Sequence, residues 1–140
     1  MEKNQLGVMS NVVSYLFRVM DISLRHDNIL VYWTMRLILR QMQTSSVEMW
    51  PVVIAAFCLI CKVTTTYEYN FRTVRRQVAA FLRADIKATS AECTRIERDM
   101  LIAADYDLLG LLAQMMPAGW YMKRLKICRE KPASARPPDA

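Results

Sequence analysis

The feature that most constrains this sequence is the apolar run from Met49 to Cys61, which carries no charged side chain. Such a run would be apolar on every face of a helix, so the helix must be enclosed by protein or by lipid. The run is shorter than the roughly 20 apolar residues that a membrane-spanning helix needs. We therefore expect a buried core helix over about residues 50–62, enclosed by other helices, with Lys62 at its exit.

Length and composition agree with a single all-α domain. A chain of 140 residues can bury a core without disulfides or a metal. It is 54% hydrophobic and has only three Gly, which disfavours the tight turns that sheets need. The first residues, Met1 to Gln5, are polar and include an acid, so they do not resemble a secretory signal, and we expect an intracellular protein.

Hydrophobic periodicity predicts further helices around the core helix. After Asn11, apolar side chains recur at i, i+3, i+4 and i+7, which is typical of an amphipathic helix. Residues 1–10 are expected to be flexible. Thr89 and Glu92 have the T-x-x-E spacing of a capping box, which marks a helix start. With the core helix, the predicted five-helix bundle comprises residues 11–22, 29–43, 50–62, 70–83 and 89–104.

Both ends of the core helix need interpretation. Ser45 and Glu48 have capping-box spacing, but proline is more favourable in a first turn than inside a helix. The helix therefore either begins near Met49 or bends at Pro51. The β-branched residues 63–67 are interpreted as an extended loop, because a single strand in a helical chain has no partner.

The C-terminal part divides into an ordered and a flexible section. Residues 105–107 are expected to form a turn, and residues 108–116 have the pattern of a sixth, short helix before Pro117. Residues 117–140 form a basic tail rich in Pro and Ala, for which we expect no stable structure. The helical domain then spans residues 11–116.

The sequence contains no arrangement of residues typical of an enzyme or a metal site. Cys58 and Cys61 are spaced as C-x2-C, but they lie inside the apolar run, and no second pair or His stands at zinc spacing. We interpret them, with Cys93 and Cys128, as thiols of a reducing compartment, the pair in the core. His26 has no nucleophile near it in sequence. We expect no catalytic activity, no metal and no cofactor.

The net charge of +6 is concentrated in two segments, residues 72–87 and 117–140, where basic side chains outnumber acids. Such an excess attracts nucleic acid or an anionic membrane surface, or it is simply a solvated helix face. Residues 120–129 have the composition of a segment at a membrane interface. No integral membrane insertion is expected.

Two stretches resemble the cyclin box. Residues 53–62 are similar to its third helix, in which small and apolar residues end in a lysine. Residues 89–108 resemble its fifth helix, with the capped start, the Ile96-Glu97 pair and an aromatic-Asp-Leu ending. The resemblance covers about residues 10–110. It implies a single box, most similar to cyclins of the phosphate-regulated and cyclin Y types.

The resemblance implies a non-catalytic subunit that binds and activates a cyclin-dependent-type protein kinase. By position, Lys62 and Glu97 would hold the regulatory C helix of the kinase. The apolar contacts to that helix would come from Val63, Leu101, Tyr106 and Leu108.

Some features depart from cell-cycle cyclins. The first helix lacks their Met-Arg-x-x-Leu substrate-docking patch, and Met35 stands before Arg36 where they have an aspartate. Ile60 and Cys61 replace the small residues before the lysine, and there is no second box. Two alternatives stay open: a cyclin-fold module that binds nucleic acid, and a helical adaptor without a kinase partner.

Overall fold

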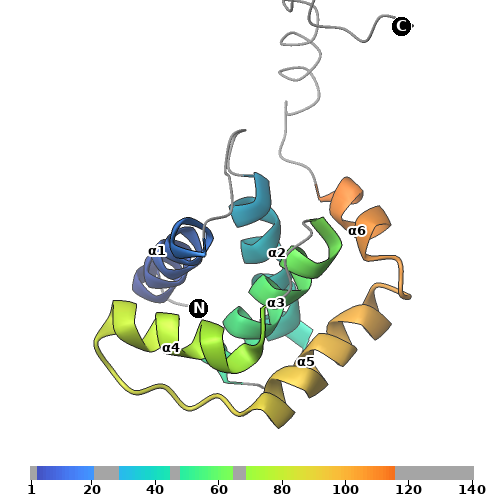
Figure 1. Cartoon of the computed structure of the whole chain (residues 1–140). Coiled ribbons are helices and arrows are strands. Elements are labelled where there is room, and N and C mark those ends of the chain that lie inside the picture. The colour runs from blue at the N-terminus through green and yellow to red at the C-terminus, as the bar shows by residue number, and fades with distance from the viewer. Residues whose placement is uncertain (1–2, 21–28, 45–47, 65–68, 116–140) are drawn as a thin grey trace, which may run out of the picture.

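The computed structural model of the chain describes residues 3–20, 29–44, 48–64 and 69–115, and all regular secondary structure in these ranges is helical. This confirms the all-α class (Figure 1). The helices are α1 (Lys3–Val19), α2 (Ile29–Thr44), α3 (Met49–Thr64), α4 (Phe71–Leu82), α5 (Ser90–Ala103) and α6 (Leu108–Gln114). The predicted basic tail lies outside the described residues.

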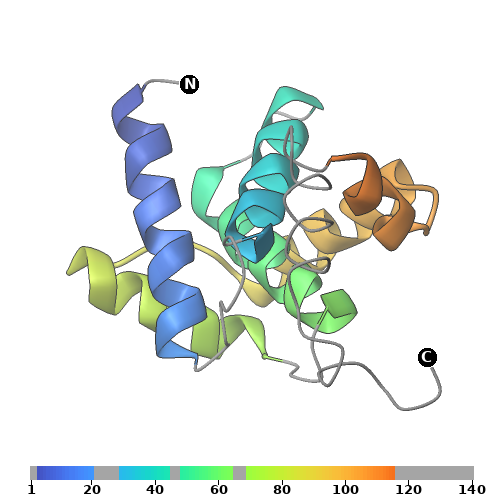
Figure 2. The ribbon, with the colours of Figure 1, turned by 90° about the horizontal axis from the view of Figure 1, so that it is seen from above.

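The core helix α3 is enclosed as the sequence predicts. Every residue from Pro51 to Cys61 is buried, and α3 packs against α1, α2, α4 and α5. Figures 1 and 2 show α1 and α5 on opposite sides of α3. The helix begins at Met49, so Pro51 stands in the first turn, where its missing N–H is not needed.

The N-terminal prediction is wrong, because α1 begins at Lys3 and residues 3–10 are helical. Met9 is fully buried and extends the apolar stripe one turn before Val12 and Val13. Burial of this face stabilises a segment whose own composition is polar. Further along α1, the ring of Phe17 packs edge-on against Phe57 of α3 at 4.8 Å between centroids.

Helix caps fix the ends of α4 and α5. The Asn70 side chain accepts a hydrogen bond from the Thr73 N–H, and α4 ends where Arg83 adopts a left-handed conformation with φ 52. The predicted capping box of α5 is confirmed, since Thr89 and Glu92 each accept from the backbone of the other. The expected loop at residues 63–67 is wrong at its start, because α3 continues through Thr64.

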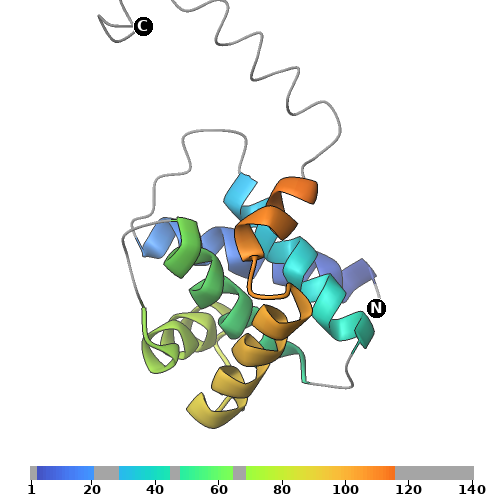
Figure 3. The ribbon, with the colours of Figure 1, turned by 90° about the vertical axis from the view of Figure 1, so that its right-hand side faces the viewer.

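The turn between α5 and α6 reverses the chain. Asp105 and Tyr106 have positive φ values of 53 and 58, which is uncommon for residues other than Gly. The Asp107 side chain then caps α6 by accepting from the Gly110 N–H at 3.1 Å. The short sixth helix expected over residues 108–116 is therefore present as α6, in addition to the five helices of the predicted bundle, and Figure 3 shows α6 folded back above α5.

Candidate partner-binding site

An ion pair joins α3 to α5. The Lys62 ammonium donates a hydrogen bond to Glu97 Oε1 at 2.7 Å, and the two side chains are 31% and 15% exposed. Lys62 lies in the last turn of α3, and Glu97 lies in the middle of α5, which packs alongside. No other ion pair occurs among the described residues. The structure thus brings together the two charged residues that the sequence singled out.

Hydrogen bonding satisfies only part of this Lys62–Glu97 pair. Glu97 Oε2 is buried and has no hydrogen-bond partner among the described residues. The Lys62 ammonium also lies 5.7 Å from the centre of the Phe71 ring, within the range of a cation–π contact. Exposed ion pairs contribute about 0–1 kcal/mol to stability, and an unpaired buried oxygen opposes that gain. The contribution of the Lys62–Glu97 pair to fold stability is therefore too small to explain its presence.

The predicted apolar contacts differ in exposure. Val63 and Leu101 are half-buried and pack against the core from beside the pair. Tyr106 is 70% exposed. Leu108 is only 4% exposed, so its prediction as a partner contact is wrong. The turn at residues 105–107 directs the Leu108 side chain into the core, where it anchors α6.

Two further exposed apolar side chains lie at the same corner of the molecule. Ile102, in the last turn of α5, is 54% exposed, and Leu109, in the first turn of α6, is 59% exposed. The exposure of Ile102 could have been predicted from the sequence, because this residue lies outside the apolar stripe of α5 formed by Cys93, Ile96 and Met100. We call Ile102, Tyr106 and Leu109 the α5–α6 corner. Large exposed apolar side chains that lie close together in the chain are candidates for an interaction site.

The cysteine thiols of the described residues are unreactive at neutral pH. Cys58, Cys61 and Cys93 are all buried, which confirms the interpretation of the C-x2-C pair as core thiols. Burial raises the pKa of Cys61 to about 12, and burial, helped by Glu92 and Glu97, raises the pKa of Cys93 to about 11. Burial also raises the pKa of Cys58, with smaller contributions from Cys61 and Glu97. They stay protonated at neutral pH, so they are poor nucleophiles and poor metal ligands. Cys128 lies outside the described residues.

Comparison of the chain with protein-family models, with curated proteins and with solved structures finds no match. Within the described ranges, no helix combines the length and the apolar character that crossing a bilayer requires. The chemistry of the surface around the Lys62–Glu97 pair is therefore the basis for a functional proposal.

Proposed function

We propose that this chain is a non-catalytic regulatory subunit that binds and activates a cyclin-dependent-type protein kinase through α3 and α5. The observation that supports this most is the Lys62–Glu97 pair, whose members are 35 residues apart in sequence and 2.7 Å apart in space. The cyclin-box resemblance expects a lysine and a glutamate side by side at this position. The proposal includes an intracellular location, where such kinases are found.

The pair has capacity for a second molecule. A lysine ammonium has three N–H donors, and Lys62 spends one of them on Glu97. The remaining donors suit backbone carbonyls at the C-terminus of a partner helix, where cations are favoured. Because Glu97 already holds the lysine in place, less side-chain entropy is lost on binding than for a free lysine.

Apolar contacts beside the pair supply the remaining interface. Leu101 lies four residues after Glu97, so the two share a face of α5, and Val63 follows Lys62 in α3. The α5–α6 corner extends this surface with exposed Tyr106. A stable complex buries about 800 Å² on each partner, which these elements supply only together.

Activation needs no reacting group from this chain. A regulatory subunit stabilises the active kinase if it binds the active arrangement more tightly than the inactive one. Moving a kinase from about 1% to about 99% active requires a preference of roughly 5.5 kcal/mol. A charged contact together with several buried apolar side chains can reach that value.

Co-purification tests the proposal. We expect tagged wild-type chain to recover a kinase from cells, and a Lys62→Ala/Glu97→Ala variant to lose it. Arg98→Ala/Asp99→Ala is the matched control, because it removes one charge of each sign from exposed positions on α5. Recovery of the same proteins by wild type and by Lys62→Ala/Glu97→Ala would refute the proposal.

A charge swap separates contact with a partner from support of the fold. Lys62→Glu/Glu97→Lys keeps an ion pair between α3 and α5 but reverses its direction. If the pair only stabilises the fold, the swapped variant should bind like wild type. We expect it to fold, as measured by circular dichroism, and to recover no kinase.

One observation favours the nucleic-acid alternative. Four arginines lie on α4 or at its end, and none of them has an ion-pair partner among the described residues. They are Arg72, Arg75, Arg76 and Arg83. Phosphate contacts by these side chains would make affinity fall steeply with salt. Absence of DNA or RNA binding at low salt would exclude this function. Recovery of a protein other than a kinase, lost in Lys62→Ala/Glu97→Ala, would support the adaptor alternative.

A further inference from the structure

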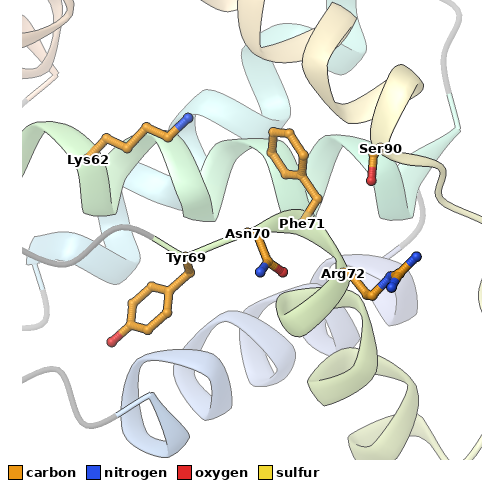
Figure 4. A pocket seen from close by; sticks show the side chains of 6 residues that line it. All are labelled: Lys62, Tyr69, Asn70, Phe71, Arg72 and Ser90. Atoms are coloured by element: carbon orange, nitrogen blue, oxygen red, sulfur yellow. The ribbon is translucent and has the colours of Figure 1, made fainter.

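A hollow opens beside the Lys62–Glu97 pair, where the end of α3 meets the starts of α4 and α5. Its volume is about 570 Å³, and Figure 4 shows Lys62, Arg72 and Ser90 reaching it from three different helices. A second hollow of about 230 Å³ shares Arg72 and Ser90 with the first. We call the two together the basic hollow. Their lining residues are Lys62, Tyr69, Asn70, Phe71, Arg72, Arg75, Ala88, Thr89 and Ser90.

Among the described residues, the hollow is lined by three cations, Lys62, Arg72 and Arg75, and by no acid. Lys62 is engaged by Glu97, but Arg72 and Arg75 have neither an ion-pair nor a hydrogen-bond partner in the described part of the chain. They stand three residues apart on α4, so the two guanidinium groups lie on neighbouring positions of one face. The acid in the adjoining turn, Glu92, accepts from the Thr89 backbone N–H at 3.3 Å and from its hydroxyl at 3.0 Å.

The polar groups of the hollow are mainly donors. Asn70 uses its side-chain oxygen to cap α4, which leaves its NH2 group as a donor. No hydrogen bond of the Ser90 hydroxyl occurs among the described residues. Arginine presents a planar fork of N–H groups that matches a phosphate in bidentate geometry. A phosphate monoester, with a charge of about −1.5 to −2 at pH 7, fits this set of donors.

The arrangement favours a phosphorylated protein over a nucleic acid. The other cations on α4 and at its end, Arg76 and Arg83, do not line the hollow. Stacking of bases needs free aromatic rings. Tyr69 is engaged, since its hydroxyl donates to the Met20 carbonyl at 2.7 Å, and the Phe71 ring has Lys62 beside it.

We propose that the basic hollow binds a phosphoserine or phosphothreonine side chain of the protein held at the Lys62–Glu97 pair. Arg72 and Arg75 hold the phosphate, Ser90 donates a further hydrogen bond, and Lys62 adds positive charge from the edge. The hollow is larger than one phosphate group, so residues that flank the phosphorylated side chain also fit in it. The identity of the partner rests on the proposed function, but phosphate binding by the isolated chain does not.

The experiment measures fluorescence anisotropy of labelled peptides with the full isolated chain. The probes are a phosphothreonine peptide, its unphosphorylated form, inorganic phosphate as competitor, and single-stranded DNA. We expect the phosphopeptide to bind at least about tenfold more tightly than the unphosphorylated peptide, a difference of about one bidentate charged contact. Inorganic phosphate should compete only weakly, because it lacks the flanking residues.

Matched variants separate the hollow from general charge. Arg72→Ala/Arg75→Ala and Arg76→Ala/Arg83→Ala each remove two positive charges from α4 or its end. We expect the first variant to lose about tenfold or more in phosphopeptide affinity, and the second to stay within about twofold of wild type. Circular dichroism of both variants checks that neither substitution affects the fold.

Several results would overturn the inference. These are equal losses in the two variants, equal binding of phosphorylated and unphosphorylated peptides, equal affinity for inorganic phosphate, or tighter binding of DNA than of phosphopeptide. The kinase is absent from this assay, so a negative result leaves kinase recovery untouched. If the co-purification experiment refuted the kinase proposal, the measured affinity for the phosphopeptide would still be valid.

Discussion

Removal of the Lys62–Glu97 pair should affect the stability of the fold much less than it affects partner binding. In wild type, Glu97 Oε1 accepts from Lys62, while Oε2 is buried without a partner in the part of the chain that the structure describes. Lys62→Met keeps the apolar stem but removes the ammonium, so the carboxylate is left half-buried without any partner. Lys62→Met/Glu97→Leu removes both charges and keeps the volume of both side chains.

The magnitudes follow from the exposure of the two groups. An unsatisfied polar group costs about 1–3 kcal/mol when fully buried. Because Glu97 is 15% exposed and Lys62 is 31% exposed, solvent screens part of this cost. We expect Lys62→Met to lower the free energy of unfolding by about 1–2 kcal/mol. The double substitution should lie within about 1 kcal/mol of wild type, because it leaves no charge unpaired.

Urea denaturation followed by far-UV circular dichroism measures both variants at pH 7. The comparison uses the midpoint and requires an unchanged dependence on urea, so that the change reports stability alone. The reasoning would be refuted if the double variant were more than about 3 kcal/mol less stable than wild type, the range for breaking a buried pair. In that case the pair supports the fold, and its position at the surface no longer argues for a partner.

Three further predictions concern the surrounding structure. Leu108→Ala should lower the free energy of unfolding by about 2–4 kcal/mol in the same urea assay, because Leu108 is buried. Tyr106→Ala should leave the urea midpoint unchanged and reduce kinase recovery. The opposite pattern would contradict the placement of the α5–α6 turn. Thr89→Ala should lower the free energy of unfolding by about 1 kcal/mol through loss of the α5 cap, and Thr89→Ser, which keeps the cap, should not. Burial raises the pKa of Cys61 to about 12 and that of Cys93 to about 11, from an ordinary value of 9.0. The unfolded thiols therefore release protons first, and the free energy of unfolding should fall between about pH 9 and pH 11 by about 1.4 kcal/mol per pH unit for each thiol. A Cys61→Ala/Cys93→Ala variant with the same pH slope as wild type would contradict this assignment.

The parts of the fold that local chemistry determines were predictable from the sequence. An uncharged apolar run has only one place in a helical domain, so the burial of residues 51–61 follows from composition alone. The capping box of α5 is likewise a local arrangement of Thr89 and Glu92. The meeting of Lys62 with Glu97 is not local, and only the family resemblance predicted it.

The parts that failed depend on tertiary contacts. Residues 3–8 are all exposed, including the apolar side chains of Leu6 and Val8, and they are helical because Met9 extends a stripe that α1 buries against its neighbours. Tyr106 lies in the turn before α6 and Leu108 is the first residue of α6, and the sequence alone does not show which of these two apolar side chains is buried. The positive φ values of Asp105 and Tyr106 decide which one faces the core. Residues other than Gly rarely adopt that conformation, so no propensity predicted it.

Lys62 belongs both to the ion pair and to the wall of the basic hollow, and this gives a prediction in which the two proposed binding events change in opposite directions. Glu97→Gln removes the acid that holds the ammonium, so the charge of Lys62 becomes available to a phosphate beside Arg72. The phosphothreonine peptide should then bind about two- to fivefold more tightly, the size of a screened charge effect, while kinase recovery falls. Asp99→Asn makes the same change of charge at an exposed position of α5 and should change neither. An equal gain in both variants would mean a general effect of net charge, and no gain in Glu97→Gln would place Lys62 outside the phosphate site.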